Sequence, residues 1–212
     1  MPDLADTELL TLARSVIQAE SRAVLSTLDS LDDGFVKTAR LMSQCRGKVL
    51  VTGSGTSGAV AVRAAHLLSV GGTPAFYLSP ADGLHGGLGV LRPGDIVLAL
   101  SKSGGSDDLN EFCNRGRTLC GCLLVITASP ASALAAMADH VVRLTLDDDA
   151  DLGMVVATGS SLATAAVIDA LVEIGRVVRD YDWKDLFFTH PAGAVGLQSA
   201  RDLERLADPE GA

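Results

Sequence analysis

Short apolar runs rich in β-branched residues alternate with helical segments along most of this chain. Five such runs cover residues 48–53, 74–79, 96–101, 122–129 and 140–146, and a long helical segment at 158–180 follows the last of them. Strands that are apolar at every position are typical of a parallel sheet covered on both faces. The sequence therefore predicts an α/β fold, a three-layer αβα sandwich around a five-stranded parallel sheet.

Two amphipathic helical segments precede the first strand. Their apolar residues recur at helical spacing over 6–30 and 33–45. We expect a single domain over residues 1–212, with N-terminal helices at 6–45, an α/β core at 48–180 and a C-terminal tail at 181–212. Because the first two helices precede strands rather than connect them, we expect them to pack against another subunit.

Composition disfavours several classes of partner. The formal net charge is −9 and aromatic residues make up 4% of the chain, so binding to nucleic acid or to anionic lipid is disfavoured. No apolar run approaches the ~18 residues of a membrane span, and the acidic N-terminus lacks the apolar block of a signal peptide. We expect a soluble cytoplasmic protein without a metal site, whose cysteines are reduced core thiols. These are Cys45, Cys113, Cys120 and Cys122.

The strand at 48–53 runs into a glycine-rich turn, "GSGTSG" at 53–58. Its spacing fits the dinucleotide-binding pattern G-x-G-x-x-G, but that pattern also needs an acidic residue about 20 residues on, at the end of the second strand. Ser79 and Pro80 stand there, and Asp82 lies beyond them. A nucleoside triphosphate loop is excluded, because no Gly-Lys-Ser/Thr follows.

A cradle for a single phosphoryl group is the third interpretation of this turn. Three hydroxyl-rich segments each open a helix, around Ser57, at "SKSGGS" (101–106) and at "TGSS" (158–161). The carboxyl ends of parallel strands meet at one edge of the sheet, where free helix amides favour an anion. The competing interpretation is that serine and threonine are simply good helix N-caps.

These motifs together resemble the SIS (sugar isomerase) domain, and most closely the arabinose-5-phosphate isomerases. The resemblance runs through "VLVTGSGTSG", "SKSGGSDDL", "ATGSSLATAA" and "FTHPAGAVG", from about residue 15 to 197. It implies a flavodoxin-like five-stranded sheet and a phosphorylated sugar as ligand, with no cofactor. It also implies a homotetramer, or a dimer, with sites between subunits.

The resemblance also implies which residues act. Substrate and phosphate binding would fall to Ser54, Gly55, Thr56, Ser57, Ser101, Ser103, Ser106, Thr158 and Ser160, and catalysis to His85, His190, Asp149 and Lys102. The chain departs from the family pattern at Thr56, where a lysine is usual, and at Gly105, where a glutamate is usual. Lys102 replaces an asparagine, and the regulatory CBS pair that commonly follows the domain has no counterpart in these residues.

Three functions remain open at this point. The first is aldose–ketose isomerisation, through an enediol, of a sugar phosphate other than arabinose 5-phosphate or of a broader set that includes it. This reaction needs an acid, a base and a group that stabilises the oxyanion. Two histidines suit the proton transfers, Lys102 replaces the charge of the missing lysine, and Asp149 or Asp151 supplies an acid or base. The second is a non-catalytic sugar-phosphate-binding module that regulates a partner. The third is a nicotinamide-dependent oxidoreductase.

Overall fold

Five parallel strands form the centre of the computed structural model, which describes residues 4–190. The strands are β1 (Val49–Gly53), β2 (Ala75–Tyr77), β3 (Ile96–Leu100), β4 (Leu123–Thr127) and β5 (His140–Arg143). They pair in the order β2-β1-β3-β4-β5, and every pair is parallel. This is the flavodoxin-like strand order, so the predicted fold class is confirmed.

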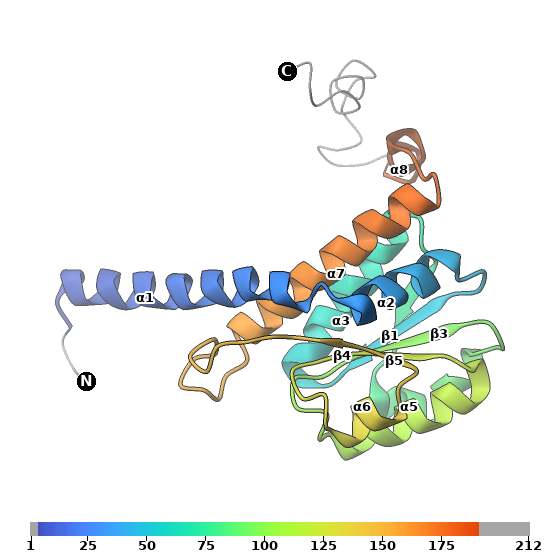
Figure 1. The fold of residues 1–212 in the computed structure, drawn as a ribbon, viewed down its shortest axis with the longest axis horizontal. Helices are drawn as coiled ribbons and strands as arrows, with labels where there is room; N and C mark the ends of the chain where they lie inside the picture. Colours follow the sequence, from blue (N-terminus) through green and yellow to red (C-terminus); the bar gives the residue numbers. More distant parts are fainter. Residues whose placement is uncertain (1–3, 191–212) are drawn as a thin grey trace.

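Helices cover both faces of the sheet (Figure 1). On one face lie α2 (Asp33–Gln44), α3 (Gly55–Val70) and α7 (Gly159–Val178), and on the other lie α4 (Pro80–Leu84), η2 (Gly87–Val90), α5 (Asp107–Cys120) and α6 (Ala133–Met137). Alternate residues of each strand enter opposite cores: Leu98 and Leu100 pack below α3 and α7, whereas Val97 and Ala99 pack on α5. Burial on both faces explains why the three central strands, β1, β3 and β4, are largely apolar.

The direction of winding reverses between β1 and β3. The chain leaves β1 into α3 on one face and leaves β3 into α5 on the other, although the two strands are neighbours. Such a switch point opens a crevice at the carboxyl ends of the strands, which is where open α/β sheets bind ligands. The glycine-rich turn and the serine loop border this crevice.

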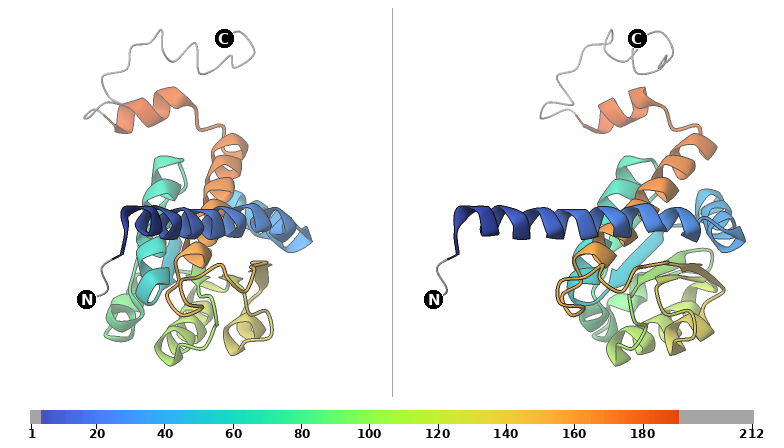
Figure 2. Two further views of the ribbon diagram at one scale, coloured as in Figure 1. Left: turned by 90° about the vertical axis from the view of Figure 1, so that its left-hand side faces the viewer. Right: turned by 60° about the vertical axis from the view of Figure 1, so that its left-hand side comes forward.

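The N-terminal helix α1 (Asp6–Leu25) projects away from the sheet (Figures 1 and 2). Its contacts with the rest of the chain are mainly with α7, and Ala23 is its one buried residue. The helix predicted over residues 6–30 ends at Leu25, and a 3-10 turn, η1 (Ser26–Ser30), follows it. Both N-terminal helices were expected to pack against another subunit. The second, α2, instead packs Phe35 and Met42 into the core of its own chain.

Two segments differ from the sequence expectation. Residues 80–95, for which the sequence predicts no helix, contain α4 and η2. Ser79 caps α4, accepting a hydrogen bond from the Asp82 amide at 3.1 Å, and Pro80 occupies its first turn. The expected tail contains α8 (Trp183–Thr189), beyond the C-terminal end of α7. Among the helices of residues 4–190, none is long and apolar enough to cross a bilayer.

Candidate functional site

Three helices that begin at the carboxyl edge of the sheet lack a side-chain cap. Ser54, Ser106 and Thr158 stand at the N-caps of α3, α5 and α7, yet none of their hydroxyls accepts a helix amide. Ser79 on α4 and Ser132 on α6, by contrast, do cap their helices. Capping therefore does not explain the hydroxyls of α3 and α5, whose first amides remain available to an anion.

A cavity of about 320 Å³ lies over the carboxyl end of β1. It is lined by Gly53, Ser54, Gly55, Gly58, Ala59, Val62, Tyr77, Ser79, Pro80, Ala81 and Asp108. Ser54 and Gly55 were expected at the site, whereas Asp108 was not. The clue to Asp108 was its place in the first turn of the helix that follows the serine loop. Of the other residues expected on this turn, Thr56 is exposed and Ser57 half-buried in the first turn of α3.

The glycine spacing of this turn has a packing explanation. A Cβ added at Gly58 would lie 2.9 Å from the carbonyl oxygen of Gly53, so strand and helix meet too closely for a side chain. Gly55 adopts a φ of 58°, which favours glycine. Asp82, the acid nearest the expected ribose position, binds the Ser79 hydroxyl within α4 at 2.6 Å. The close approach at Gly58 and the positive φ at Gly55 thus account for the glycine pattern without a dinucleotide.

The serine loop between β3 and α5 is folded tightly on itself. Ser101 Oγ accepts the amide of Gly104 at 3.0 Å, and Ser103 Oγ accepts the amide of Gly105 at 3.4 Å. Gly104 adopts a φ of 64°, and a Cβ there would lie 2.2 Å from Ser132 Oγ. The loop thus holds two predicted phosphate-binding serines in place by local bonds, next to the open N-terminus of α5.

Lys102, in the same loop, reaches across the edge to α7. Its Nζ lies 2.6 Å from Asp151 Oδ2, and the Asp151 carboxylate also accepts the amide and the hydroxyl of Ser160, both at 2.8 Å. Burial alone would raise the pKa of Asp151, but the Lys102 ammonium and the two Ser160 donors outweigh it and lower the pKa below its ordinary value. Asp151 is therefore ionised at neutral pH.

Asp151 occupies the N-terminus of α7. The Ser160 amide and hydroxyl are both bound to it, and the Gly159 amide donates to the carbonyl of Ala150 at 3.2 Å. Thr158 Oγ1 accepts the Leu152 amide at 3.3 Å. Thr158 and Ser160, expected to bind phosphate, thus have partners within the protein, and the start of α7 is filled by an internal anion.

Asp149 lies apart from this cluster. It is exposed and pairs with Arg22 of α1 at 2.6 Å, beside a groove of about 510 Å³ between α1 and the segment 149–154. The structure therefore brings Lys102 together with Asp151 rather than with Asp149.

The two histidines expected to act lie in different places. His85 is exposed just after α4, and its Nδ1 donates to the carbonyl of Ala81 at 2.7 Å. Because a carbonyl only accepts, a proton is assigned to Nδ1, which leaves Nε2 as the ring nitrogen that can act as a base. His190 ends α8, beyond the far end of α7, which is about 30 Å long. It does not meet the carboxyl edge of its own chain; the rest of its motif, from Pro191, lies outside the described residues.

The edge carries no evident metal site. Within residues 4–190, no three His, Cys, Asp or Glu side chains gather in a way that would hold a metal ion.

Comparison with known proteins points to one family. Residues 41–174 match the SIS domain. The chain is 32% identical to the arabinose 5-phosphate isomerase GutQ of Escherichia coli K12 and 34% identical to the arabinose 5-phosphate isomerase KdsD of Pseudomonas aeruginosa. These alignments cover 93% and 91% of the chain but 62% and 59% of the relatives, so the chain spans about three-fifths of their length.

Solved structures agree with this assignment. The fold superposes on an Escherichia coli CFT073 protein, c3406, in complex with A5P, with a TM-score of 0.84 and 26% identity over 89% of this chain and 100% of that one. A candidate sugar-phosphate isomerase from Listeria monocytogenes gives a TM-score of 0.85 and 28% identity over 90% of this chain and 100% of that one. With this fold, this strand order and a family match over most of the sheet, the chain belongs to the SIS domain family.

Proposed function

We propose that this chain is a sugar-phosphate isomerase that interconverts the aldose and ketose forms of its substrate through an enediol. The observation that carries the proposal is that the serine loop, the uncapped starts of α3 and α5, and a 320 Å³ cavity lined by Asp108 of α5 all lie at one edge of the sheet. That volume is near the lower end of the range for ligand pockets, about 300–1,000 Å³. Relatives that are arabinose 5-phosphate isomerases support the choice of a sugar phosphate.

In this proposal the phosphoryl group binds at the serine loop and the sugar extends over β1. Ser101, Ser103 and Ser106 supply hydroxyls, and the first amides of α5 supply further donors. The Nε2 atom of His85 and the carboxylate of Asp108 are the candidate proton carriers, and Asp149 remains a proposed acid or base. Lys102 supplies the positive charge for a phosphate or enediolate oxygen.

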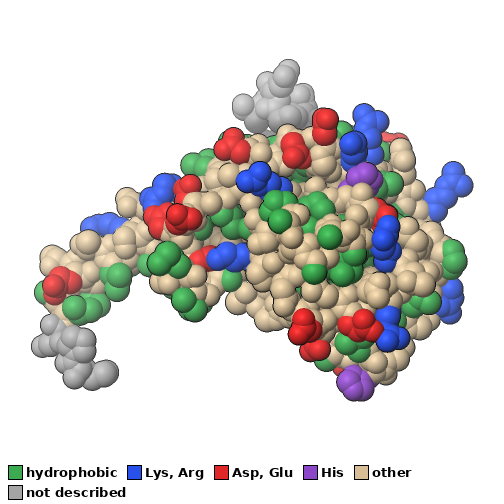
Figure 3. Space-filling view, turned by 60° about the horizontal axis from the view of Figure 1, so that its bottom comes forward, with side chains coloured by type: hydrophobic (Ala, Val, Ile, Leu, Met, Phe, Trp, Pro, Cys, Tyr) green, Lys and Arg blue, Asp and Glu red, His purple; other side chains and the backbone are tan. Residues whose placement is uncertain are grey.

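We also propose that the chain assembles into a homotetramer or dimer with sites at subunit interfaces. The exposed helix α1 supports this, because a helix that projects alone is marginally stable in water. Figure 3 shows hydrophobic side chains along its surface, and Leu9, Leu12 and Ile17 are each at least half exposed. His190 would then serve a neighbouring site. Light scattering tests this: a monomer would contradict the proposed role of His190.

A non-catalytic sugar-phosphate-binding module is the second candidate. It is favoured by Thr56 and Gly105, which stand where related isomerases usually carry lysine and glutamate. The two candidates differ in one chemical step, because an isomerase must release and return the proton at C2 of the sugar, whereas a binding module need not.

The test is an incubation of the protein with arabinose 5-phosphate and other sugar phosphates of three to seven carbons in heavy water, followed by NMR. Deuterium at C2 together with the ketose signal supports the isomerase, and binding without exchange favours the module. We expect His85→Ala and His190→Ala each to lower turnover about 100-fold, the scale of a lost acid–base group. His66→Ala, an exposed histidine within α3, is the matched control; unaltered turnover in both test variants would remove their proposed roles.

A further inference from the structure

Asp151 is the most completely buried acid near the candidate site. Its side chain is 1% exposed, yet it accepts three hydrogen bonds from two elements. Lys102 approaches from the loop after β3, and Ser160 belongs to the first turn of α7. These donors lie 49 and 9 residues away in sequence, so the carboxylate ties two separate parts of the edge together.

The surroundings of Asp151 do not suit a proton carrier. Oδ1 accepts the Ser160 amide, and Oδ2 accepts both the Ser160 hydroxyl and the Lys102 ammonium. Every one of these bonds favours the ionised form, and burial keeps the side chain from direct contact with a ligand. Its chemistry is that of a fixed anion that holds a cation.

Lys102 is fixed at its base and open at its tip. Its carbonyl oxygen accepts the Thr127 hydroxyl at 3.1 Å and the Ala128 amide at 3.2 Å, which anchors the backbone to the end of β4. One of the three ammonium protons is directed at Asp151, and the side chain remains 45% exposed. The remaining protons are therefore accessible at the same edge as the serine loop.

We infer that Asp151 is a positioning residue for ligand binding: it holds the Lys102 ammonium at the carboxyl edge so that Lys102 binds the phosphoryl group of the sugar phosphate. Without Asp151, the flexible lysine side chain would lose rotamer entropy on each binding event. With it, that ordering is complete before the ligand arrives. The inference rests on the proposed function and adds a residue to its binding machinery.

The experiment compares Asp151→Asn, Lys102→Met and the double variant with the unaltered protein. Calorimetry with arabinose 5-phosphate, inorganic phosphate and unphosphorylated arabinose measures affinity without requiring turnover. We expect each single variant to bind the two phosphate-bearing probes about tenfold more weakly, equivalent to about 1.4 kcal/mol. The double variant should be little weaker than either single one, because both changes remove the same contact. Unphosphorylated arabinose should show no change.

Kinetics separate positioning from chemistry. Where turnover is measurable, KM should rise about tenfold in Asp151→Asn while kcat stays within about twofold. This pattern is expected when the lost interaction is equally strong in the substrate complex and in the transition state. The matched control is Asp169→Asn, which makes the same chemical change in the exposed Arg63–Asp169 pair and should leave binding unaltered. Lys102→Arg, which keeps the charge, should recover part of the affinity.

Several outcomes would overturn the inference. Unaltered affinity in Asp151→Asn would show that the carboxylate only stabilises the fold. A lower kcat at constant KM would show that it takes part in the chemical step. Additive losses in the double variant would show that the two residues act separately. Should Asp151→Asn fail to fold, Lys102→Met against Lys102→Arg decides, and equal affinities for phosphate in the two would refute the role of the charge. If the unaltered protein binds no sugar phosphate at all, the proposed function fails, and the inference fails with it.

Discussion

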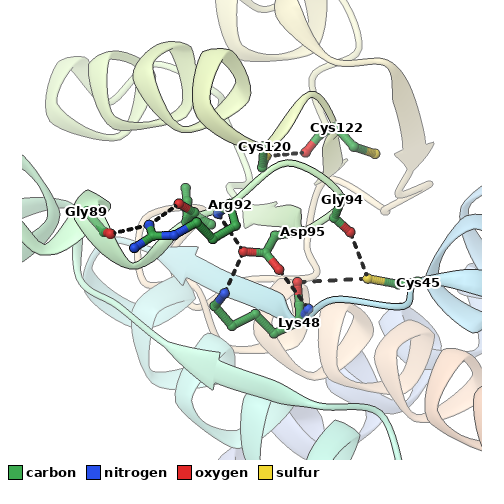
Figure 4. Close-up of polar contacts among 9 residues, drawn as sticks. Cys45, Lys48, Gly89, Arg92, Gly94, Asp95, Cys120 and Cys122 are labelled. Atoms are coloured by element: carbon green, nitrogen blue, oxygen red, sulfur yellow. Dashed lines mark hydrogen bonds and ion pairs between the residues drawn. The ribbon is translucent and has the colours of Figure 1, made fainter.

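The two edges of the sheet each contain a buried aspartate paired with a lysine. At the carboxyl edge Asp151 meets Lys102, and at the amino edge Asp95 meets Lys48, with an Nζ to Oδ2 distance of 2.6 Å in both pairs. Asp95 also accepts the amides of Lys48 at 2.9 Å and Arg92 at 2.8 Å (Figure 4). Each carboxylate thus accepts three hydrogen bonds, one of them from a lysine ammonium.

Their neighbours differ. Asp95 joins the start of β1 to the turn before β3, where α5 ends at Cys120 and no helix of the sheet layers begins. Helix C-termini carry partial negative charge and disfavour an anion. Asp151 lies where α3, α5 and α7 begin, next to the serine loop. We therefore attribute the binding role inferred for the Asp151–Lys102 pair to the helix ends around it, not to the geometry of the pair.

The largest expected effect is on stability, at the amino edge. Asp95→Ala removes the carboxylate and leaves two partly buried amides and Lys48 without their acceptor, which we expect to cost about 3 kcal/mol of unfolding free energy. Urea unfolding measures this. Affinity for arabinose 5-phosphate should stay unaltered in the folded variant; a loss like that expected for Asp151→Asn would mean that the two edges do not differ in function.

A pair of glycines at opposite ends of α5 sharpens the comparison. Gly121 has a φ of 85° with open space for a Cβ, so Gly121→Ala should cost about 1–2 kcal/mol from backbone strain alone. Gly104→Ala adds the close approach to Ser132, so its loss of unfolding free energy should be larger. It should also weaken phosphate binding, because it deforms the serine loop. Equal phosphate affinities in the two variants would argue against a binding role for this loop.

Acid should weaken both pairs in the same pH window. Burial would raise the pKa of Asp95, but Lys48 and the two amides outweigh it, so the folded-state pKa of both aspartates lies below the ordinary value. Their stabilisation is therefore complete above about pH 4, the ordinary pKa of aspartate, and is lost as the pH falls through the lowered values. Urea unfolding at a series of pH values should show a flatter acid limb in Asp95→Asn and in Asp151→Asn than in the unaltered protein. An identical limb would contradict the lowered pKa values.

The smallest effect is expected for the exposed pair at the carboxyl edge. Arg22→Gln breaks the contact with Asp149, and both side chains are more than half exposed. The unfolding free energy should change by less than about 1 kcal/mol, because solvent screens such pairs. A loss as large as that of Asp95→Ala would show that α1 depends on this contact.

The sheet could be predicted from the sequence because its three central strands are buried on both faces, which leaves apolar runs such as 96–100. The short helices could not be predicted in the same way. The helix α4 is five residues long and rich in loop-forming residues, and its cap at Ser79 looks like any turn serine. Periodicity needs more residues than these segments contain.

The candidate site was readable only in part. The hydroxyl-rich loops were visible as local patterns, but Asp149 and Asp151 stand in one acidic run and look alike in sequence. Only the fold separates them, since it brings Lys102 to Asp151 from 49 residues away. Asp108 was missed for the same reason, because its place in the cavity depends on the packing of α5 beside the β1 turn.

The carboxylate at the start of α7 has a consequence for ligand selection. Asp151 takes the Ser160 amide at the start of α7 and one proton of Lys102, so a sugar with phosphoryl groups at both ends would find no free helix amide there for its second group. We therefore expect this edge to discriminate against bisphosphorylated sugars and to accept compounds whose other end is neutral. The protein would thus exclude doubly phosphorylated metabolites by a group of its own rather than by the size of its cavity.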